Sequence, residues 1–207
     1  MADQARFWDR ISTKYARRPI ADEAAYQQKL EVTQSYFEPE LEVLEFGCGT
    51  GGTAIRHAPF VKHIYAIDIS PKMIEIARRK AVKARVFNAK FYVASIDEFV
   101  PPDRGYDAVL GMSILHLLAN RDAVIAKVHA MLKPGGVFIS STVCLGDFAP
   151  WMRIVAPIGG AVGLLPTLRV FTAKQLAASL IGAGFEIDHE WRPGKKDSVF
   201  IVAKKPG

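Results

Sequence analysis

Short apolar runs alternate with amphipathic stretches over most of the chain, and this alternation predicts strands that are connected by helices. The five strands expected from these runs lie at residues 42–46, 63–67, 91–94, 106–110 and 137–143. Among the intervening stretches, the spacing of Met73, Ile74, Ala77 and Ala81 marks the inner face of a helix. Strands that alternate with helices in this way form a parallel sheet with helices on both faces.

Two helices are predicted before the first strand. Apolar side chains four positions apart predict a helix over residues 3–16, and a second helix is expected over residues 21–37. Because both helices precede the first strand, residues 1–40 could fold over the loop that follows it as a helical lid. Trp8 and Tyr15 would then either contact a ligand or serve only as packing residues.

The alternation breaks after the fifth strand. Residues 146–171 are apolar but rich in glycine and proline, and Thr172 with Gln175 forms a capping-box pattern that opens a helix. Two further strands, at 185–191 and 198–203, are joined by a short turn and are therefore antiparallel. The predicted fold is α/β: a Rossmann-like, doubly wound, seven-stranded sheet, mostly parallel, with an antiparallel C-terminal hairpin.

The first strand runs into a loop with four glycines in six positions, Gly47-Cys48-Gly49-Thr50-Gly51-Gly52. Because glycine has no Cβ, such a loop lets a ligand approach the backbone closely. Asp68 ends the second strand 21 residues after Gly47, close to the ~20 expected for a carboxylate that accepts hydrogen bonds from ribose hydroxyls. The strand, the loop and the carboxylate predict a nucleotide site; a plain glycine turn and a helix-capping aspartate are the alternatives.

Composition and charge narrow the class of protein. Half of the 207 residues are hydrophobic, no apolar run is long enough for a membrane span, and no signal-peptide core is visible, so we expect a cytoplasmic protein. Cys48 and Cys144 are expected to be reduced, with Cys144 a small buried residue, and no metal site is predicted. The net charge of +6 is concentrated between Lys72 and Lys90, where a solvated helix face is favoured over a nucleic-acid site.

Beyond these patterns, nearly the whole chain resembles the class I S-adenosylmethionine-dependent methyltransferases, in particular small-molecule enzymes like those that methylate ubiquinone and menaquinone precursors. Glu45-x-Gly47-x-Gly49-x-Gly51 is similar to the first motif of that family, with its acidic residue two positions before the first glycine. Asp68 matches the acidic residue that ends the second strand. Ser95-Ile96 matches the position that contacts adenine, although the family often has Asp where Ser95 stands, and Ser is the weaker acceptor.

The resemblance implies that S-adenosylmethionine is the cofactor and gives each site residue a role. Glu45 would lie near the ammonium and sulfonium of the cofactor, Asp68 would bind its ribose, and Ile69 and Met73 would pack against its adenine. The residues expected to bind the cofactor are Tyr15, Glu45, Gly47, Gly49, Gly51, Asp68, Ile69, Met73, Ser95, Ile96 and Gly111.

The implied activity is methyl transfer by in-line displacement to an O, N or C atom of a small, partly apolar metabolite, a reaction that depends mainly on orientation. His116 follows the fourth strand and is the candidate general base, the alternative being a packing residue. The segment Gly111-Met112-Ser113-Ile114 stands where enzymes that methylate base amino groups often carry Asn/Asp-Pro-Pro-Tyr/Phe, which disfavours that class.

Several alternatives remain open at this level. Residues 146–171 could cover a substrate, form core, or face a membrane weakly; the side chains concerned are Trp151, Met152, Ile154, Val155, Leu164 and Leu165. An NAD(P)-dependent oxidoreductase is disfavoured because Glu45 would oppose a pyrophosphate, and a non-catalytic nucleotide-binding scaffold is the third reading. We expect one methyltransferase domain over residues 1–207, acting as a monomer or homodimer.

Overall fold

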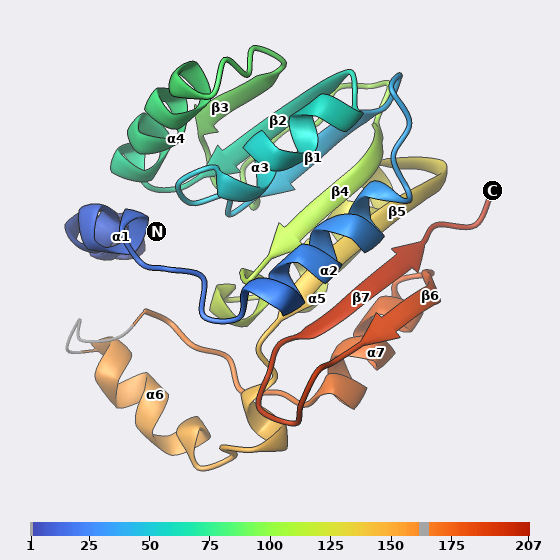
Figure 1. Ribbon diagram of the computed structural model, residues 1–207. Helices are drawn as coiled ribbons and strands as arrows, with labels where there is room; N and C mark the ends of the chain where they lie inside the picture. The colour runs from blue at the N-terminus through green and yellow to red at the C-terminus, as the bar shows by residue number, and fades with distance from the viewer. Residues whose placement is uncertain (1, 162–165) are drawn as a thin grey trace. The chain divides into compact units, whose positions relative to one another are not determined.

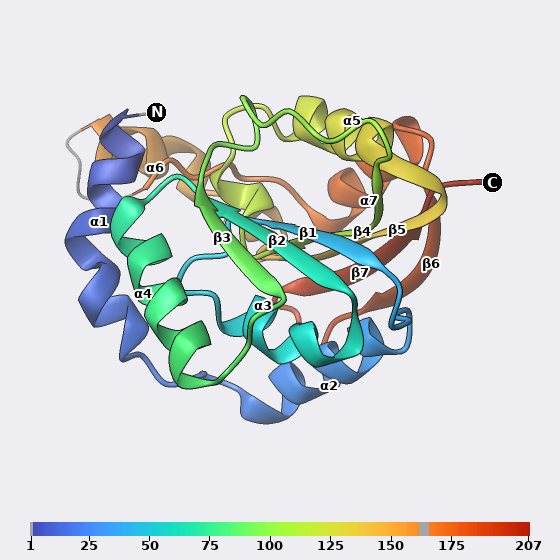
Figure 2. The ribbon, with the colours of Figure 1, turned by 90° about the horizontal axis from the view of Figure 1, so that it is seen from above.

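The computed structural model describes residues 2–161 and 166–207 and divides into two compact units, Met1–Val100 and Pro101–Gly207 (Figures 1 and 2). The elements of the first unit are α1 (Ala2–Ala16), α2 (Glu23–Gln34), β1 (Glu42–Phe46), α3 (Gly52–His57), the 3-10 helix η1 (Ala58–Phe60), β2 (His63–Asp68), α4 (Pro71–Lys83) and β3 (Ala89–Val93).

The sheet of the first unit brings the ends of β1 and β2 together. Both β1–β2 and β2–β3 are parallel pairs, and Phe46 at the end of β1 lies opposite Ile67, one residue before the end of β2. All five residues of β1 are buried, including the two glutamates Glu42 and Glu45. Figures 1 and 2 show α3 and α4 on the same face of this sheet. The glycine loop after β1 and Asp68 therefore share one edge of the sheet.

Helix α4 forms where the sequence predicts it. The Ser70 hydroxyl accepts a hydrogen bond from the Met73 amide at 3.1 Å. Pro71 occupies the first turn, where a backbone N–H would form no hydrogen bond within the helix, so proline is tolerated there. The predicted inner face is buried, as the exposures of Met73, Ile74, Ala77 and Ala81 show. The helix is thus held by its N-cap and by an apolar stripe against the sheet.

The second unit carries the antiparallel hairpin. Its described elements are β4 (Tyr106–Met112), η2 (Leu115–Leu117), α5 (Arg121–Met131), β5 (Leu132–Thr142), η3 (Leu145–Asp147), α6 (Met152–Ala161), α7 (Ala173–Gly182), β6 (Glu186–Trp191) and β7 (Val199–Lys204). The β4–β5 pair is parallel, whereas β7 pairs antiparallel with both β5 and β6, as predicted. Helix α7 begins with the predicted capping box of Thr172 and Gln175.

The start of β5 differs from the prediction. The sequence predicts a turn before a strand that starts at residue 137, but β5 starts at Leu132 and the intervening residues form an irregularity between two register positions of β4. The physical reason is a distant partner: the backbone N–H of Gly135 donates to Lys205 O at 3.0 Å, and that of Lys205 donates to Gly136 O at 2.9 Å. These bonds continue the ladder beyond β7 and hold the segment in the sheet.

Helix α6 also lies within a segment for which the sequence predicts no element. It follows η3 after the carboxyl end of β5 and stands apart from the strands of its unit (Figure 1). Trp151 and Ile154 are 60% and 74% exposed, so the interpretation of these two side chains as core is wrong. Leu164 and Leu165, assigned to the same apolar group, lie outside the described residues. Cys144 is fully buried, as predicted.

Candidate functional site

The glycine loop is shaped by backbone conformations that favour glycine. Gly47, Gly49 and Gly51 all have positive φ, and a Cβ at Gly51 would lie 2.7 Å from Phe91 Cε1 and 2.8 Å from Ala77 Cβ. No larger residue fits at Gly51 without moving β3 or α4. The loop therefore turns sharply against the sheet, and α3 begins directly after it.

Asp68 links the end of β2 to this loop. One of its carboxylate oxygens, Oδ2, accepts a hydrogen bond from the Gly49 amide at 2.9 Å, and Oδ1 accepts one from the Ser70 amide at 2.8 Å. Burial raises the pKa of Asp68, while these two amides act in the opposite direction. Each oxygen retains a lone pair, so the carboxylate can accept further hydrogen bonds from a ligand.

Glu45 lies on β1, directly before the loop, and is almost completely buried. Within the described residues its Oε2 atom has no hydrogen-bond partner, and the Ala54 amide in the first turn of α3 donates to the carboxyl group. Burial, reinforced by the charge of Asp68, raises the pKa of Glu45 to about 8. An unpartnered buried carboxyl is costly, and a cationic ligand group at this position would remove that cost.

Tyr15 brings α1 to the same place. Its Cε1 atom lies 3.7 Å from the position that a Cβ on Gly49 would occupy. Burial and then the charge of Asp68 raise the pKa of its hydroxyl, and Glu45 acts in the same direction. The ring also meets Trp8 edge-on, with the ring centroids 6.2 Å apart. The structure thus groups Tyr15, Glu45, Gly49 and Asp68, four of the predicted cofactor-binding residues.

Sequence reasoning missed the residue that holds α1 beside α4. Asp9 Oδ1 accepts a hydrogen bond from the Ser70 hydroxyl at 2.6 Å and another from the Lys72 amide at 3.0 Å. Its charge also helps to raise the pKa of Asp68. Because Asp9 and Ser70 are 61 positions apart, no local pattern could reveal the contact. Helix α1, part of the segment 1–40 that we expect to act as a lid, is therefore held at the N-terminus of α4.

The residues assigned to adenine occupy positions of differing exposure. Ile69 is half-buried, whereas Met73 and Ile96 are 2% and 5% exposed. The Ser95 hydroxyl donates to Asp97 Oδ2 at 3.4 Å and accepts from the Asp97 amide at 3.2 Å, so it is engaged in a local turn. This turn brings a carboxylate beside Ser95, where the resembled family often has an aspartate of its own, and it makes Asp97 a site candidate that sequence reasoning did not select.

Gly111 and His116 belong to the second unit. Gly111 lies in β4 and pairs with Ser140 of β5. His116 lies in η2, and its backbone oxygen accepts a hydrogen bond from the Arg169 amide at 2.8 Å. Burial lowers the pKa of His116 to about 4, and within the described residues Nδ1 has no hydrogen-bond partner. The imidazole is therefore neutral near pH 7 and can accept a hydrogen bond, but it is a weaker base than free imidazole.

The described residues form neither a metal site nor a helix that could span a membrane. No group of three or more His, Cys, Asp or Glu side chains in this part of the chain is arranged to hold a metal ion. Every helix within the described ranges is too short or too polar to cross a bilayer. Neither Glu45 nor Asp68 forms an ion pair with a described residue, so the acidic group around the glycine loop presents uncompensated carboxyls to a ligand.

The sequence of this chain is similar to those of known methyltransferases. Residues 43–136 match the family model described as "Methyltransferase domain". Malonyl-[acyl-carrier protein] O-methyltransferase of Priestia megaterium is 30% identical over 145 residues, which cover 69% of this chain and 52% of that protein. Demethylmenaquinone methyltransferase of Tropheryma whipplei is 34% identical over 117 residues, covering 56% of this chain and 45% of that protein. The chain thus spans about half the length of these curated relatives.

A solved structure resembles nearly the whole chain. The N-methyltransferase NodS from Bradyrhizobium japonicum, in complex with S-adenosyl-L-homocysteine, has a TM-score of 0.76 at 17% identity and covers 99% of this chain and 100% of its own. At this identity the likeness shows the fold alone. It confirms the predicted Rossmann-like α/β fold with antiparallel C-terminal strands.

Proposed function

We propose that this protein transfers a methyl group from S-adenosylmethionine to a small, partly apolar metabolite, as the sequence resemblance implies, and the match of residues 43–136 to the methyltransferase domain model supports this proposal. The observation that supports the cofactor most directly is a buried Glu45, whose Oε2 atom has no partner among the described residues, beside an Asp68 that is held by two backbone amides. A pyrophosphate-bearing dinucleotide would bring negative charge to the same carboxyls, which disfavours the oxidoreductase alternative.

The two carboxyls suit the two ends of this cofactor. Glu45 can bind the ammonium of its methionine part, because Oε2 is buried and has no partner among the described residues. Asp68 can accept hydrogen bonds from ribose hydroxyls while it keeps the amides of Gly49 and Ser70. Gly47, Gly49 and Gly51 allow the loop backbone to lie close to the ligand, and Tyr15 covers it from α1. These contacts fix orientation, which is what an in-line displacement chiefly requires.

The cofactor, when bound, supplies an electrophilic methyl group on a sulfonium with a good leaving group. The part left to the chain is to orient the acceptor atom and to manage its proton. We assign both roles to His116: its neutral ring accepts a hydrogen bond from an acceptor hydroxyl or amine and thereby orients it, and the ring takes that proton once methyl transfer has made the group acidic. With a pKa of about 4, the ring does not carry the proton before methyl transfer.

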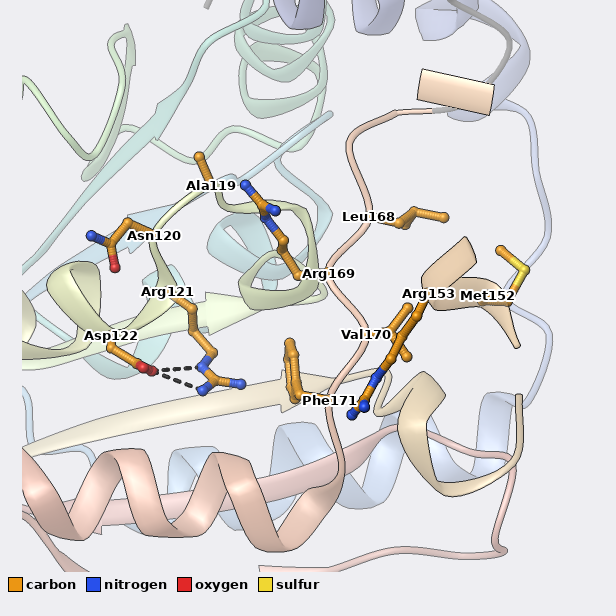
Figure 3. A pocket seen from close by; sticks show the side chains of 10 residues that line it. All are labelled: Ala119, Asn120, Arg121, Asp122, Met152, Arg153, Leu168, Arg169, Val170 and Phe171. Atoms are coloured by element: carbon orange, nitrogen blue, oxygen red, sulfur yellow. Dashed lines mark hydrogen bonds and ion pairs between the residues drawn. The ribbon is translucent and has the colours of Figure 1, made fainter. Parts of the chain in front are cut away.

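Analogy with relatives and a cavity in the second unit support the proposed class of acceptor. The two curated relatives carry names that specify a malonyl-[acyl-carrier protein] and demethylmenaquinone. By analogy, we infer that this protein also has a methyl acceptor of its own, which we propose is a small metabolite with a partly apolar body. Met152 and Leu168 of the 146–171 segment line a cavity (Figure 3) and supply apolar contacts for such a body.

Calorimetric titration with S-adenosylhomocysteine tests the cofactor assignment. We expect wild-type protein to bind, and Asp68→Asn and Glu45→Gln each to weaken binding about 10- to 100-fold through loss of a charge-assisted hydrogen bond. Glu38→Gln changes an exposed glutamate after α2, and this matched control should bind like wild type. Absence of binding by the wild-type protein would end the proposal.

A second experiment identifies the acceptor. The protein is incubated with isotopically labelled S-adenosylmethionine and fractionated cell extract, and mass spectrometry finds the metabolite that gains the methyl group. Binding of S-adenosylhomocysteine without turnover on any fraction would favour the non-catalytic scaffold. His116→Gln, which keeps a hydrogen-bonding side chain but not the imidazole, should lower turnover without changing S-adenosylhomocysteine affinity.

A further inference from the structure

The apolar face of α1 is incompletely buried. Its side chains Phe7, Trp8 and Ile11 are only half-buried, whereas the inner face of α4 is buried. The segment after α1, residues 17–22, is exposed throughout and leads into α2. A helix with a partly solvated apolar face and an exposed connection gains less from packing than a core helix does. Contacts of another kind must therefore help to keep α1 in one place.

Asp9 supplies such a contact at the N-terminus of α4, beside which α1 lies in both views (Figures 1 and 2). Its Oδ1 atom accepts hydrogen bonds from the Ser70 hydroxyl at 2.6 Å and from the Lys72 amide at 3.0 Å. Backbone N–H groups in the first turn of a helix have no partner within the helix, and the helix dipole favours a negative charge there. Asp9 therefore satisfies a free donor of α4 from a different helix.

Tyr15 is a second point at which α1 meets the first unit. It lies six residues after Asp9, a separation of about 9 Å along a helix. Its Cε1 atom is 3.7 Å from the position of a Cβ on Gly49, so the ring lies against the glycine loop. Because the two residues belong to one continuous helix, a helix that is held at Asp9 keeps the ring of Tyr15 at the loop.

Ser70 connects Asp9 to the carboxylate that we expect to bind ribose. Its backbone amide donates to Asp68 Oδ1 at 2.8 Å, and its hydroxyl donates to Asp9 while it accepts from the Met73 amide. If Asp9 is removed, Ser70 can still cap α4 and still hold Asp68. Substitution of Asp9 therefore tests the position of α1 without removing the N-cap of α4.

The charge of Asp9 does not favour the state of Asp68 that a ribose requires. Asp9 contributes to the raised pKa of Asp68, so its charge opposes the ionised form that accepts hydrogen bonds from hydroxyls. What Asp9 supplies is one oxygen that accepts from two donors, and the side-chain oxygen of asparagine can do the same. A single substitution therefore separates the geometry of Asp9 from its charge.

We propose that Asp9 is a positioning residue for cofactor binding: it holds α1 at the N-terminus of α4 and thereby keeps Tyr15 over the glycine loop. This role rests on the proposed function, because the ligand beneath Tyr15 is the proposed cofactor. When Asp9 is lost, α1 leaves α4, the Tyr15 ring no longer covers the ligand, and the ligand dissociates faster. Asp9 and Tyr15 thus act on binding through one contact.

A double-mutant cycle measures whether the two residues act together. S-adenosylhomocysteine is titrated by calorimetry into wild type, Asp9→Ala, Tyr15→Ala and the double variant. Each single substitution should weaken binding about tenfold, and the double variant should also lose about tenfold rather than a hundredfold, because both substitutions remove the same contact. Stopped-flow kinetics should show the loss in the dissociation rate.

Two further variants and a measurement without ligand control for a general structural effect. Asp9→Asn keeps the acceptor oxygen and should bind within about threefold of wild type. Asp3→Ala removes an exposed carboxylate from the first turn of the same helix and should bind like wild type. In the ligand-free protein, hydrogen exchange should become faster in α1 of Asp9→Ala and stay unchanged in β1 and β2, which confirms that the rest of the unit is folded.

The outcomes separate this role from the proposed function. If wild type binds S-adenosylhomocysteine and Asp9→Ala binds equally well, or if the losses in the double variant add up to about a hundredfold, the positioning role is overturned and methyl transfer is not. Unchanged hydrogen exchange in α1 of Asp9→Ala would also overturn the role. Absence of binding by wild type would instead refute the proposed function, and the positioning role with it.

Discussion

Binding of S-adenosylhomocysteine should release a proton from Glu45. This carboxyl is buried without a partner for Oε2 among the described residues, and it is protonated in the unliganded protein near pH 7. The ammonium group of the ligand favours the ionised form beside it. Ligand binding and deprotonation of Glu45 are therefore coupled, so that affinity depends on pH.

The size of the coupling follows from the burial of Glu45. A pKa raised from 4.5 to about 8 means that ionising this group costs about 5 kcal/mol more than ionising an exposed carboxyl. An ammonium about 4 Å away offsets about 4 kcal/mol of that cost at an effective dielectric constant of about 20, which returns the pKa to about 5. About nine tenths of a proton should then be released per ligand near pH 7, with affinity rising about tenfold between about pH 6 and pH 7.

Calorimetry in two buffers of different ionisation enthalpy measures this release directly. The difference between the two apparent binding enthalpies, divided by the difference between the buffer ionisation enthalpies, gives the number of protons released. The titrations stay between about pH 6 and pH 7, because an α-amino group loses its own proton at about pH 8. Over this range the change in affinity reports Glu45 rather than the ligand.

Two variants decide whether Glu45 is the source of the proton. Glu45→Gln should bind more weakly at pH 7, release no proton and show affinity that is flat with pH, whereas the exposed control Glu38→Gln should behave like wild type. Wild-type binding with the same enthalpy in both buffers and the same affinity at both pH values would refute the reasoning.

Two further predictions concern stability. Burial lowers the pKa of His57 from 6.5 to about 4, so as pH falls through that window the unfolded chain gains a proton that the folded protein does not. Lowering the pH through this window should reduce the free energy of unfolding by up to about 3 kcal/mol. Between about pH 7 and pH 4.5, the urea midpoint of His57→Leu should therefore fall less than that of wild type, and an equal fall would contradict this role of His57. Gly51→Ala places a Cβ 2.7 Å from Phe91 at φ +74° and should destabilise by about 2–4 kcal/mol in urea unfolding. Gly182→Ala, where nothing lies within 4 Å, should leave the midpoint nearly unchanged, and equal midpoints for the two variants would exclude the packing argument.

The predicted strands and helices were largely confirmed because their signals are local. Strand β1 coincides with the predicted residues 42–46, and the predicted inner face of α4 is buried. Where a distant partner decides the outcome, the prediction was wrong. The backbone of Lys205 holds Gly135 and Gly136 in the sheet, and no pattern within residues 132–137 could reveal that partner.

The site was predicted in part for the same reason. A glycine loop after a strand and a carboxylate at the end of the next strand are visible in the sequence. In the structure, the carboxylate of Asp68 accepts a hydrogen bond from the Gly49 amide of that loop. The partners that complete the arrangement come from elsewhere in the chain. Asp9 reaches Ser70 from α1, 61 positions away in the chain.

The sequence by itself determined the glycine loop, the carboxylates beside it and the alternation of strands and helices, because backbone conformation and hydrophobic period are local properties. Only the tertiary structure decided that Glu45 is buried without a partner for Oε2 among the described residues, and that Asp9 of α1 accepts hydrogen bonds from the N-terminus of α4. The protonation of a side chain depends on its burial and on the charges around it. Folding brings those charges from distant segments of the chain, so no local sequence pattern reveals them.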